Sequence, residues 1–265
     1  MGEDLVRKWK GFSLTEQERK EMILSHNTMD NAVKHGKFCL LAMIITNKPI
    51  NKEAFKNTMT KVWRNEGWIQ YSEVGTNKFL IEFNKDEDRQ HVMKGRPWSF
   101  DRWLLCLQAF EGHMSINEVH FNREEFWLQV HNMPLASMTL KVGNQVGGNV
   151  GRVIKVQTDT RGIGWGKFLR IRVEVDITKV LMRGMFLTID GRKTWVTFKY
   201  ERLPIFCLRC GVIKHVGKIC PQDSNGSSQN QYGAWLRATA AREDNFNQKR
   251  YVLNQNQQDG DEHYI

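Results

Sequence analysis

The sequence predicts an α+β protein: an antiparallel sheet with two helices, a second α+β segment packed beside it, a short cysteine/histidine unit and a disordered tail. Three observations predict this class. Apolar runs alternate between strand and helix spacing in the order β-α-β-β-α-β over residues 37–123. Three cysteines and one histidine gather between residues 207 and 220, and beyond them apolar residues become rare. A chain of 265 residues can hold one large or two small domains, each with its own core.

Residues 1–36 are predicted to form an N-terminal helix and a linker. Ser13 and Glu16 have the spacing of a capping box, which predicts a short charged helix at roughly residues 14–24. Residues 25–36 are polar and predict the linker. Six basic and six acidic side chains cancel within residues 1–36, so the net charge of +10 must arise further along the chain.

Residues 37–123 are predicted to form a ferredoxin-like domain, in which two helices back a four-stranded antiparallel sheet. Asn51 suits the N-cap of the first helix, and Gly75-Thr-Asn77 suits a hairpin turn. The predicted elements are the strand Phe38–Thr46, the helix Asn51–Arg64, the strands Trp68–Val74 and Lys78–Phe83, the helix Asp86–Lys94 and the strand Phe100–Phe110.

The same order of elements occurs in the RNA-recognition motif, which stacks bases on aromatic side chains of its third strand. Here Phe79, Ile81 and Phe83 alternate at the positions that the motif buries. The outward positions, including Lys78 and Leu80, carry no aromatic residue. We therefore expect that this sheet does not bind RNA by the usual stacking, and that the segment that follows covers its open face.

Residues 124–203 are predicted to form a second α+β segment with basic strands. The slip in alternation at Leu169-Arg170 allows a bulge, and Asp190-Gly191 is a favoured dipeptide for a tight hairpin turn. The loop of residues 160–167 is expected to expose Trp165. The elements are the strand Glu125–His131, a helix at about Leu135–Gly147, the strands Arg152–Thr158 and Phe168–Ile177, and the hairpin of Phe186–Ile189 with Thr194–Tyr200.

Residues 204–222 contain the most specific motif of the chain. Cys207, Cys210, His215 and Cys220 follow the spacing C-x2-C-x4-H-x4-C. Three thiolates and one imidazole complete a tetrahedral zinc shell with no open position, which is the arrangement of a structural site. Fourteen residues are too few to bury a core, so we expect one structural Zn²⁺ to supply the folding free energy of this unit, roughly 10–16 kcal/mol.

The motif resembles the zinc knuckle of retroviral and retrotransposon nucleocapsid proteins. The resemblance covers the four ligands, Gly211 and Pro221. Knuckles usually carry an aromatic residue where this chain has Leu208, and glycine where it has Lys214. These departures leave the zinc prediction untouched and weaken the prediction of base stacking.

Basic residues concentrate on the knuckle and the strands that lead to it. Residues 192–220 hold seven basic residues and one acidic residue, Glu201, which is a net charge of +6. This distribution favours a polyanionic partner. The candidate nucleic-acid contacts are Leu208, Arg209, Lys214, Lys218, Arg192, Lys193, Lys199, Arg202, Arg170 and Arg172.

The two cysteines outside the motif, Cys39 and Cys106, each lie in an apolar run and are expected to be small buried side chains rather than a disulfide. This cysteine usage fits a reducing intracellular compartment, the nucleus or the cytoplasm. No signal peptide is expected, and no apolar run approaches the length of a membrane span.

Residues 223–265 are rich in Asn and Gln and are predicted to be a largely disordered tail. One amphipathic island, Tyr232–Arg237, interrupts this composition. The sequence offers no partner for the island within the chain, so it could be a short docking segment.

Several of these blocks occur in a familiar order: Arg96-Pro-Trp-Ser-Phe100, the strand that ends at Met133-Pro134, the hairpins before Leu203-Pro204, the knuckle, and Tyr232–Arg237. Together they resemble the plant family called domain of unknown function 4283, joined to its CX2CX4HX4C knuckle, over about residues 30–240. That arrangement is typical of the gag-like first part of plant LINE-type retrotransposons and of truncated or domesticated copies. The resemblance implies a nucleic-acid-binding protein, and it does not imply catalysis.

Three functions can be weighed from these observations. The leading one is a non-enzymatic, zinc-dependent protein that binds single-stranded RNA or DNA with weak sequence specificity, in which possible self-association stays open. The alternative is a protein-interaction module in which the knuckle is only a structural staple. An enzyme is disfavoured, because the carboxylates of Asp86–Asp88 and Glu124-Glu125 and the remaining histidines match no catalytic arrangement. No small-molecule substrate and no membrane partner are expected.

Overall fold

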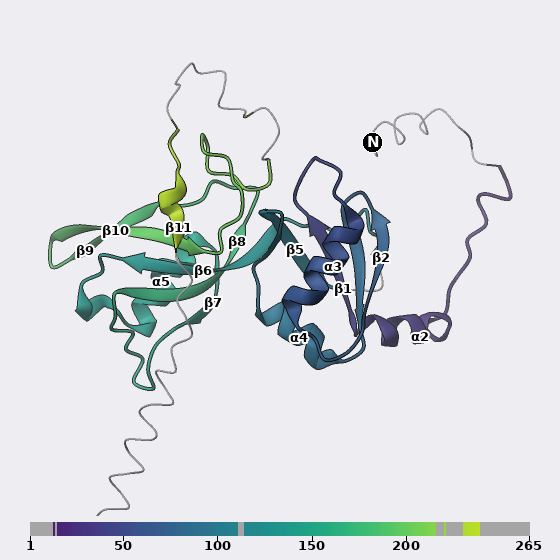
Figure 1. Cartoon of the computed structure of the whole chain (residues 1–265), viewed down its shortest axis with the longest axis horizontal. Helices are drawn as coiled ribbons and strands as arrows, with labels where there is room; N and C mark the ends of the chain where they lie inside the picture. The colour runs from purple at the N-terminus through teal and green to yellow at the C-terminus, as the bar shows by residue number, and fades with distance from the viewer. Residues whose placement is uncertain (1–12, 14, 111–113, 216–219, 221–229, 239–265) are drawn as a thin grey trace, which may run out of the picture.

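Two sheets that share one hydrophobic core form the body of the molecule in the computed structural model (Figure 1). The structure describes residues 13, 15–110, 114–215, 220 and 230–238. Lys218, most of the predicted tail and the start of the predicted N-terminal segment lie outside the described residues. Within the described residues, no helix is long and apolar enough to cross a membrane.

The N-terminal region differs from its prediction in both of its parts. A capping box does form, but between Thr15 and Glu18, and it closes a single turn rather than a helix over residues 14–24. Met22 and Ile23 are 84% and 92% exposed, so no core contact extends that turn. The segment predicted as a linker instead contains the helix α2 (His26–Gly36), which packs where Gly36 meets the ring of Phe110.

The first sheet, sheet A, realises the predicted ferredoxin-like order with one additional strand. It consists of β1 (Cys39–Ile44), β2 (Ile69–Gly75), β3 (Lys78–Phe83), β4 (Trp98–Phe100) and β5 (Trp103–Ala109), in the spatial order β2-β3-β1-β5-β4. The predicted last strand forms as β5, but its predicted start belongs to the additional strand β4, and the two strands make a hairpin that turns at Asp101 and Arg102 with φ values of 48° and 66°. Asp-Arg is not a dipeptide that favours such a turn, so the turn could not be predicted from the sequence.

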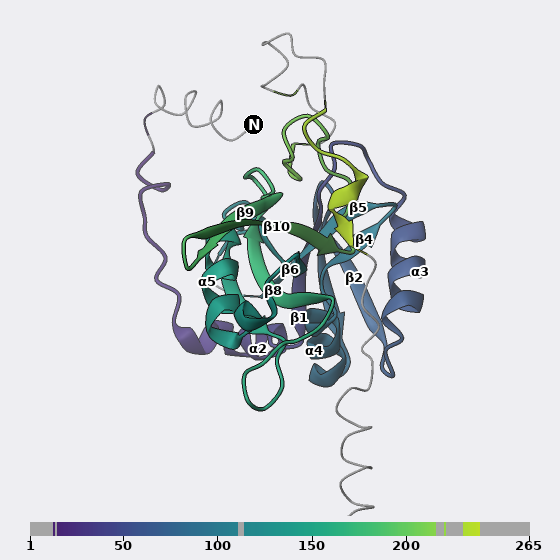
Figure 2. The same ribbon diagram turned by 90° about the vertical axis from the view of Figure 1, so that its left-hand side faces the viewer.

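Two helices cover one face of sheet A and enclose an aromatic core (Figure 2). They are α3 (Lys52–Trp63) and α4 (Asp86–Lys94). Asn51 caps α3 as predicted, since its side chain accepts a hydrogen bond of 3.0 Å from the Ala54 amide. The buried side chains include Phe55, Trp63 and Phe79, which confirms the inward face predicted for the third strand.

The other face of sheet A is covered by the second half of the chain, as its apolar character predicted. Leu41, Leu104 and Cys106 project from β1 and β5 into a core that they share with Phe126 and Val130 of the second sheet. The part of this face on β1 and β5 is therefore buried, and it offers no platform on which bases could stack.

The second sheet, sheet B, contains β6 (Arg123–His131), β7 (Arg152–Val156), β8 (Phe168–Asp176), β9 (Gly184–Ile189), β10 (Arg192–Glu201) and β11 (Arg237–Ala238). Its order is β11-β10-β6-β8-β7, and β9 also pairs with β10. A short 3-10 turn, η1 (Leu135–Ser137), precedes the helix α5 (Leu140–Val150). The helix packs closely on the sheet because Gly143 and Gly147 lie against β7 and β8.

The bulge that the sequence allows at Leu169-Arg170 does not form. Strand β8 alternates without interruption, with Leu169, Ile171, Val173 and Val175 inward, and its register with β6 is continuous. The irregularity lies in β7, between Val153 and Lys155. The turn predicted at Asp190-Gly191 is confirmed, with both residues at positive φ.

A buried ionic seam joins the segment that follows α4 to sheet B. Arg96, just after α4, pairs with the carboxylates of Glu124 and Glu125 on β6, and Arg172 on β8 pairs with Glu125. Arg172 also donates to the carbonyl of Lys94 at 2.7 Å. Because all four charged side chains are at most 13% exposed, these contacts fix the C-terminal end of α4 against sheet B.

Candidate metal centre

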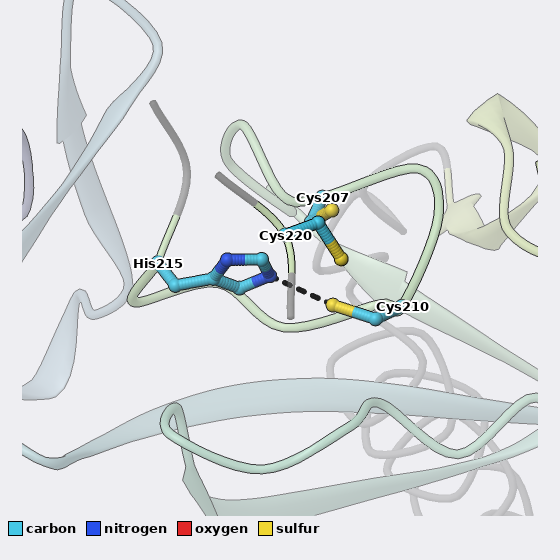
Figure 3. Close-up of side chains that lie close together, drawn as sticks. All are labelled: Cys207, Cys210, His215 and Cys220. Atoms are coloured by element: carbon cyan, nitrogen blue, oxygen red, sulfur yellow. Dashed lines mark hydrogen bonds between the residues drawn. The ribbon is translucent and has the colours of Figure 1, made fainter. Parts of the chain in front are cut away.

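The four predicted ligands converge in one place. The ligand atoms of Cys207, Cys210, His215 and Cys220 all lie within 4.8 Å of one another. Figure 3 shows the imidazole of His215 pointing at the sulfur of Cys210, and Nε2 and Sγ are 2.7 Å apart. Tetrahedral zinc with bonds of about 2.0–2.3 Å holds its ligand atoms roughly 3.3–3.8 Å apart, so these four side chains lie close to the arrangement that the ion requires.

The chemistry of the donor set also fits a bound cation. Burial, with the neighbouring Cys207 and Cys220 thiols, raises the pKa of Cys210 to about 12. Thiolates crowded into a partly buried site repel one another unless a cation neutralises them, and a divalent metal deprotonates its thiol ligands outright. The residues therefore fit one structural Zn²⁺ held by Cys207, Cys210, His215 and Cys220.

The turn between the first two ligands is built by the backbone. The amide of Gly211 donates to the carbonyl of Cys207 at 2.8 Å, and the amide of Cys207 donates to Val212 at 2.9 Å. Gly211 has a φ of +75°, which favours glycine. A Cβ on Gly211 would also lie 2.5 Å from the ring of Tyr232, so this position excludes a side chain for two independent reasons.

The knuckle is embedded in sheet B rather than separate from it. Val212 bridges Val180, and the amide of Lys214 donates to the carbonyl of Ile177 at 3.0 Å. Phe206 and Ile213 are 3% and 2% exposed and belong to the core of the sheet. The expectation that metal ligation alone must organise this unit therefore misses a contribution, because the knuckle also buries apolar side chains in the adjacent core.

Residues 231–238, which we call the clasp segment, have partners within the chain that the sequence did not reveal. The amide of Tyr232 donates to the carbonyl of Leu208 at 2.9 Å, and the Tyr232 ring covers Gly211. Leu236 is fully buried, and β11 pairs with β10 in parallel. Arg237 donates to the carbonyls of Leu203 and Pro204, so the segment contacts both the first turn of the knuckle and the residues that precede it.

Sequence reasoning missed Tyr232 and Arg183 as parts of the site. The guanidinium of Arg183 lies 5.3 Å from the centre of the Tyr232 ring and donates to the carbonyl of Gln231 at 3.2 Å. Two features of the sequence could have indicated the contact of Tyr232 with the knuckle: Gly211, which leaves room for a ring, and the apolar character of Tyr232–Arg237.

The structure separates the candidate nucleic-acid contacts into two groups. Leu208 is 42% exposed, and Arg209, Arg192 and Lys193 are also exposed, while Lys199 is half-buried. These side chains are placed where a ligand could reach them.

The other candidates are engaged within the protein. Arg170 and Arg172 are 10% and 13% exposed and are ion-paired with Glu201 and Glu125. Lys214 bonds to Asn122, and Arg202 donates to the carbonyl of Gly95 while its guanidinium lies 5.5 Å from the Trp98 ring. Lys218 lies outside the described residues.

Comparison with known proteins agrees with this geometry. Residues 33–118 match the model of a family described as "Domain of unknown function (DUF4283)". Residues 175–222 match a family described as "Zinc knuckle", a class of module that binds zinc and, in general, nucleic acids. The zinc knuckle match begins at the end of β8, which agrees with the embedding of the knuckle in sheet B.

One curated relative and one solved structure complete the comparison. The "Uncharacterized protein At4g02000" of Arabidopsis thaliana is 22% identical over 135 residues, which are 51% of this chain and 42% of that protein. The chain thus spans less than half the length of this relative. A structure of the C. elegans NONO-1 homodimer shares 10% identity over 84% of this chain and 85% of that chain, with a TM-score of 0.23, which is too low to show a common fold. The chain is therefore similar to the domain of unknown function 4283 family over residues 33–118, and to the zinc knuckle family over residues 175–222.

Proposed function

We propose that this chain is a non-enzymatic, zinc-dependent protein that binds single-stranded RNA or DNA with weak sequence specificity, in a gag-like role in an element or in a domesticated copy. The observation that carries the proposal is the convergence of the Cys3His ligands, which holds an exposed turn at Leu208 and Arg209 next to a basic sheet. Phosphates would be neutralised by the exposed lysines and arginines, while unpaired bases would meet the turn.

One specific observation favours the alternative, a protein-interaction module with the knuckle as a staple. Phe206 and Ile213 anchor the knuckle in the core of sheet B, and the clasp segment covers one side of it. A knuckle that only holds these parts together would need the metal for stability, and its exposed turn would not contribute to nucleic-acid binding.

Binding measurements separate the two functions. Fluorescence anisotropy would follow the protein with labelled single-stranded RNA, single-stranded DNA and duplex, at two salt concentrations. We expect single strands to be preferred, with log K falling against log salt by about 0.7 for each phosphate neutralised.

The contribution of the metal is tested with Cys207→Ser, which should lose the one equivalent of zinc found in the wild type and bind single strands more weakly. Cys39→Ser, at a buried cysteine outside the knuckle, is the control and should keep its zinc. Full single-strand affinity in a zinc-free Cys207→Ser protein that stays folded would overturn the zinc-dependent function.

A further inference from the structure

The outward face of sheet B carries aromatic and basic side chains in register. The inward residues of β6, β8 and β10 are buried beneath α5 and sheet A, and the alternate residues point away from that core. We call this outward surface the open face; its exposed part lies around Phe186, Trp195 and Lys193, while Gln129 and Glu201 are only 3% exposed. Pairing places Trp195 opposite Phe186, and His131 between Thr197 and Phe168.

Two aromatic pairs lie on the open face. Phe186 and Trp195 are 54% and 41% exposed, and their ring centres are 4.9 Å apart. His131 and Phe168 are half-buried, with ring centres 5.0 Å apart. Burial and the Lys199 ammonium hold the pKa of His131 below its usual value, so its ring is neutral at neutral pH and can stack as an aromatic side chain.

The acidic side chains on the open face are paired with arginines, so the charge that remains unpaired on this face is positive. Glu201 and Glu125 are neutralised by ion pairs with Arg170 and Arg172. Within the described residues, the ammonium groups of Lys193 and Lys199 have no carboxylate partner, and Lys193 lies 4.6 Å from the centre of the Phe186 ring.

Spacing along the strands suits a chain of stacked bases. Alternate residues of a strand are about 7 Å apart, and neighbouring strands are about 5 Å apart. Trp195 and Lys199 therefore lie about 14 Å apart on β10, with His131 on the adjacent strand between them. Proteins that bind single-stranded nucleic acid without sequence specificity commonly combine aromatic rings, which stack on the bases, with cationic side chains, which contact the phosphates.

We propose that the open face of sheet B is a stacking platform for single-stranded nucleic acid, with Phe186, Trp195, His131 and Phe168 receiving bases and Lys193 and Lys199 neutralising phosphates. The inference rests on the proposed nucleic-acid function and assigns its main contact surface to a sheet, not to the knuckle turn. It also places base stacking in the second half of the chain, because the corresponding face of sheet A is covered.

Alanine substitutions at the exposed pair test the platform. The probe is a labelled single-stranded RNA of about 12 nucleotides, within the usual range of site sizes. We expect Trp195→Ala and Phe186→Ala each to weaken binding about 5- to 100-fold. The slope of log K against log salt and the zinc content should not change, because no charge or ligand is altered. Trp195→Phe should recover most of the affinity.

Matched controls separate stacking from loss of folding. Trp68→Ala removes a tryptophan that is 53% exposed beside sheet A, and it should leave affinity unchanged. Lys193→Gln should reduce the salt slope by about 0.7, and this readout does not depend on the aromatic variants being stable.

The outcomes distinguish a failure of the platform from a failure of the proposed function. Wild-type affinity in folded Trp195→Ala and Phe186→Ala proteins, while the wild type binds the RNA, would overturn the platform and leave the nucleic-acid function standing. A wild type that binds no single strand at all would overturn both. Concentration-dependent dimers that Trp195→Ala abolishes without any change in RNA affinity would show that the open face pairs two copies of this chain, which also overturns the platform.

Discussion

Each ligand of the metal centre could be predicted from the sequence, because all four lie within one short segment with a recognisable spacing. The four ligands fall within the 14 residues from Cys207 to Cys220, and no distant residue is needed to complete the shell. Tyr232 could not be found in this way, since its contact with Gly211 joins positions 21 residues apart through a fold that the local sequence does not encode. The same limit applied to Arg170 and Arg172, whose charges suggested a ligand although each one neutralises a carboxylate of the protein.

We expect alanine substitutions at two glycines, Gly211 and Gly148, to change the stability of the protein in opposite directions. Gly211→Ala should lower the free energy of unfolding of the zinc-loaded protein by about 1–3 kcal/mol, because alanine is strained at positive φ and its Cβ meets the Tyr232 ring. Gly148→Ala is the counterpart. It lies in α5 with open space around its Cβ, so it should raise stability by about 0.5–1 kcal/mol.

Chemical denaturation with zinc present checks both variants. Equal stabilities of Gly211→Ala and wild type would show that the turn adapts, in which case the Tyr232 contact does not constrain it.

At the scale of elements, prediction succeeded where periodicity and capping agree. Helix α4 has the predicted bounds, Asp86–Lys94, and Asn51 caps α3. Helix α2 was missed because its sequence is polar, and it was read as a linker although Met29 and Val33 are partly buried and lie one turn apart. The clasp segment was recognised as an amphipathic island, but its docking site on β10 depends on a parallel pairing that no local pattern announces.

Removing the buried side chain of the clasp segment tests whether this element stabilises the molecule. Leu236→Ala should reduce the free energy of unfolding by about 2–5 kcal/mol, since Leu236 is fully buried in the core of sheet B. Trp235→Ala, at a neighbouring side chain that is 52% exposed, should change it by no more than about 0.5 kcal/mol. Matching thermal unfolding curves for the two variants would contradict the docking of this segment.

For the whole molecule, the packing of one half on the other was predictable in outline and not in detail. The apolar outer positions of sheet A predicted that the following segment would cover it, and Leu41 and Leu104 confirm this. The seam of Arg96, Glu124 and Glu125 was not predictable, because these residues read locally as surface charges.

The seam should give the folded protein a dependence on pH. Burial raises the pKa of Glu124 from 4.5 to about 7, against the opposing effect of Arg96. A carboxyl group whose folded pKa is raised contributes stability that is fully present below about pH 4.5 and is lost as pH rises to about 7. The loss amounts to roughly 3 kcal/mol at most.

Glu124→Gln should remove this loss and keep an acceptor for the Leu107 amide. Denaturation at pH 4.5, 6 and 7.5 should therefore show a flatter profile for Glu124→Gln than for wild type. Glu66→Gln, at a carboxylate that is 81% exposed, should follow the wild type. Parallel profiles for Glu124→Gln and wild type would mean that the carboxyl group does not titrate in this window.

The edge of β10 that faces away from β6 is occupied in two stages, first by β9 and then by β11. An unprotected strand edge is a template on which further copies of a chain can add. We therefore expect the two-residue β11 to block the addition of further copies of the chain to this part of the β10 edge, although it adds little to the area of the sheet. Chains cut before residue 231 would keep the central strands of both sheets and lose β11. We expect them to lose stability with the buried Leu236 and, in addition, to form filamentous or amorphous aggregates through the uncovered edge.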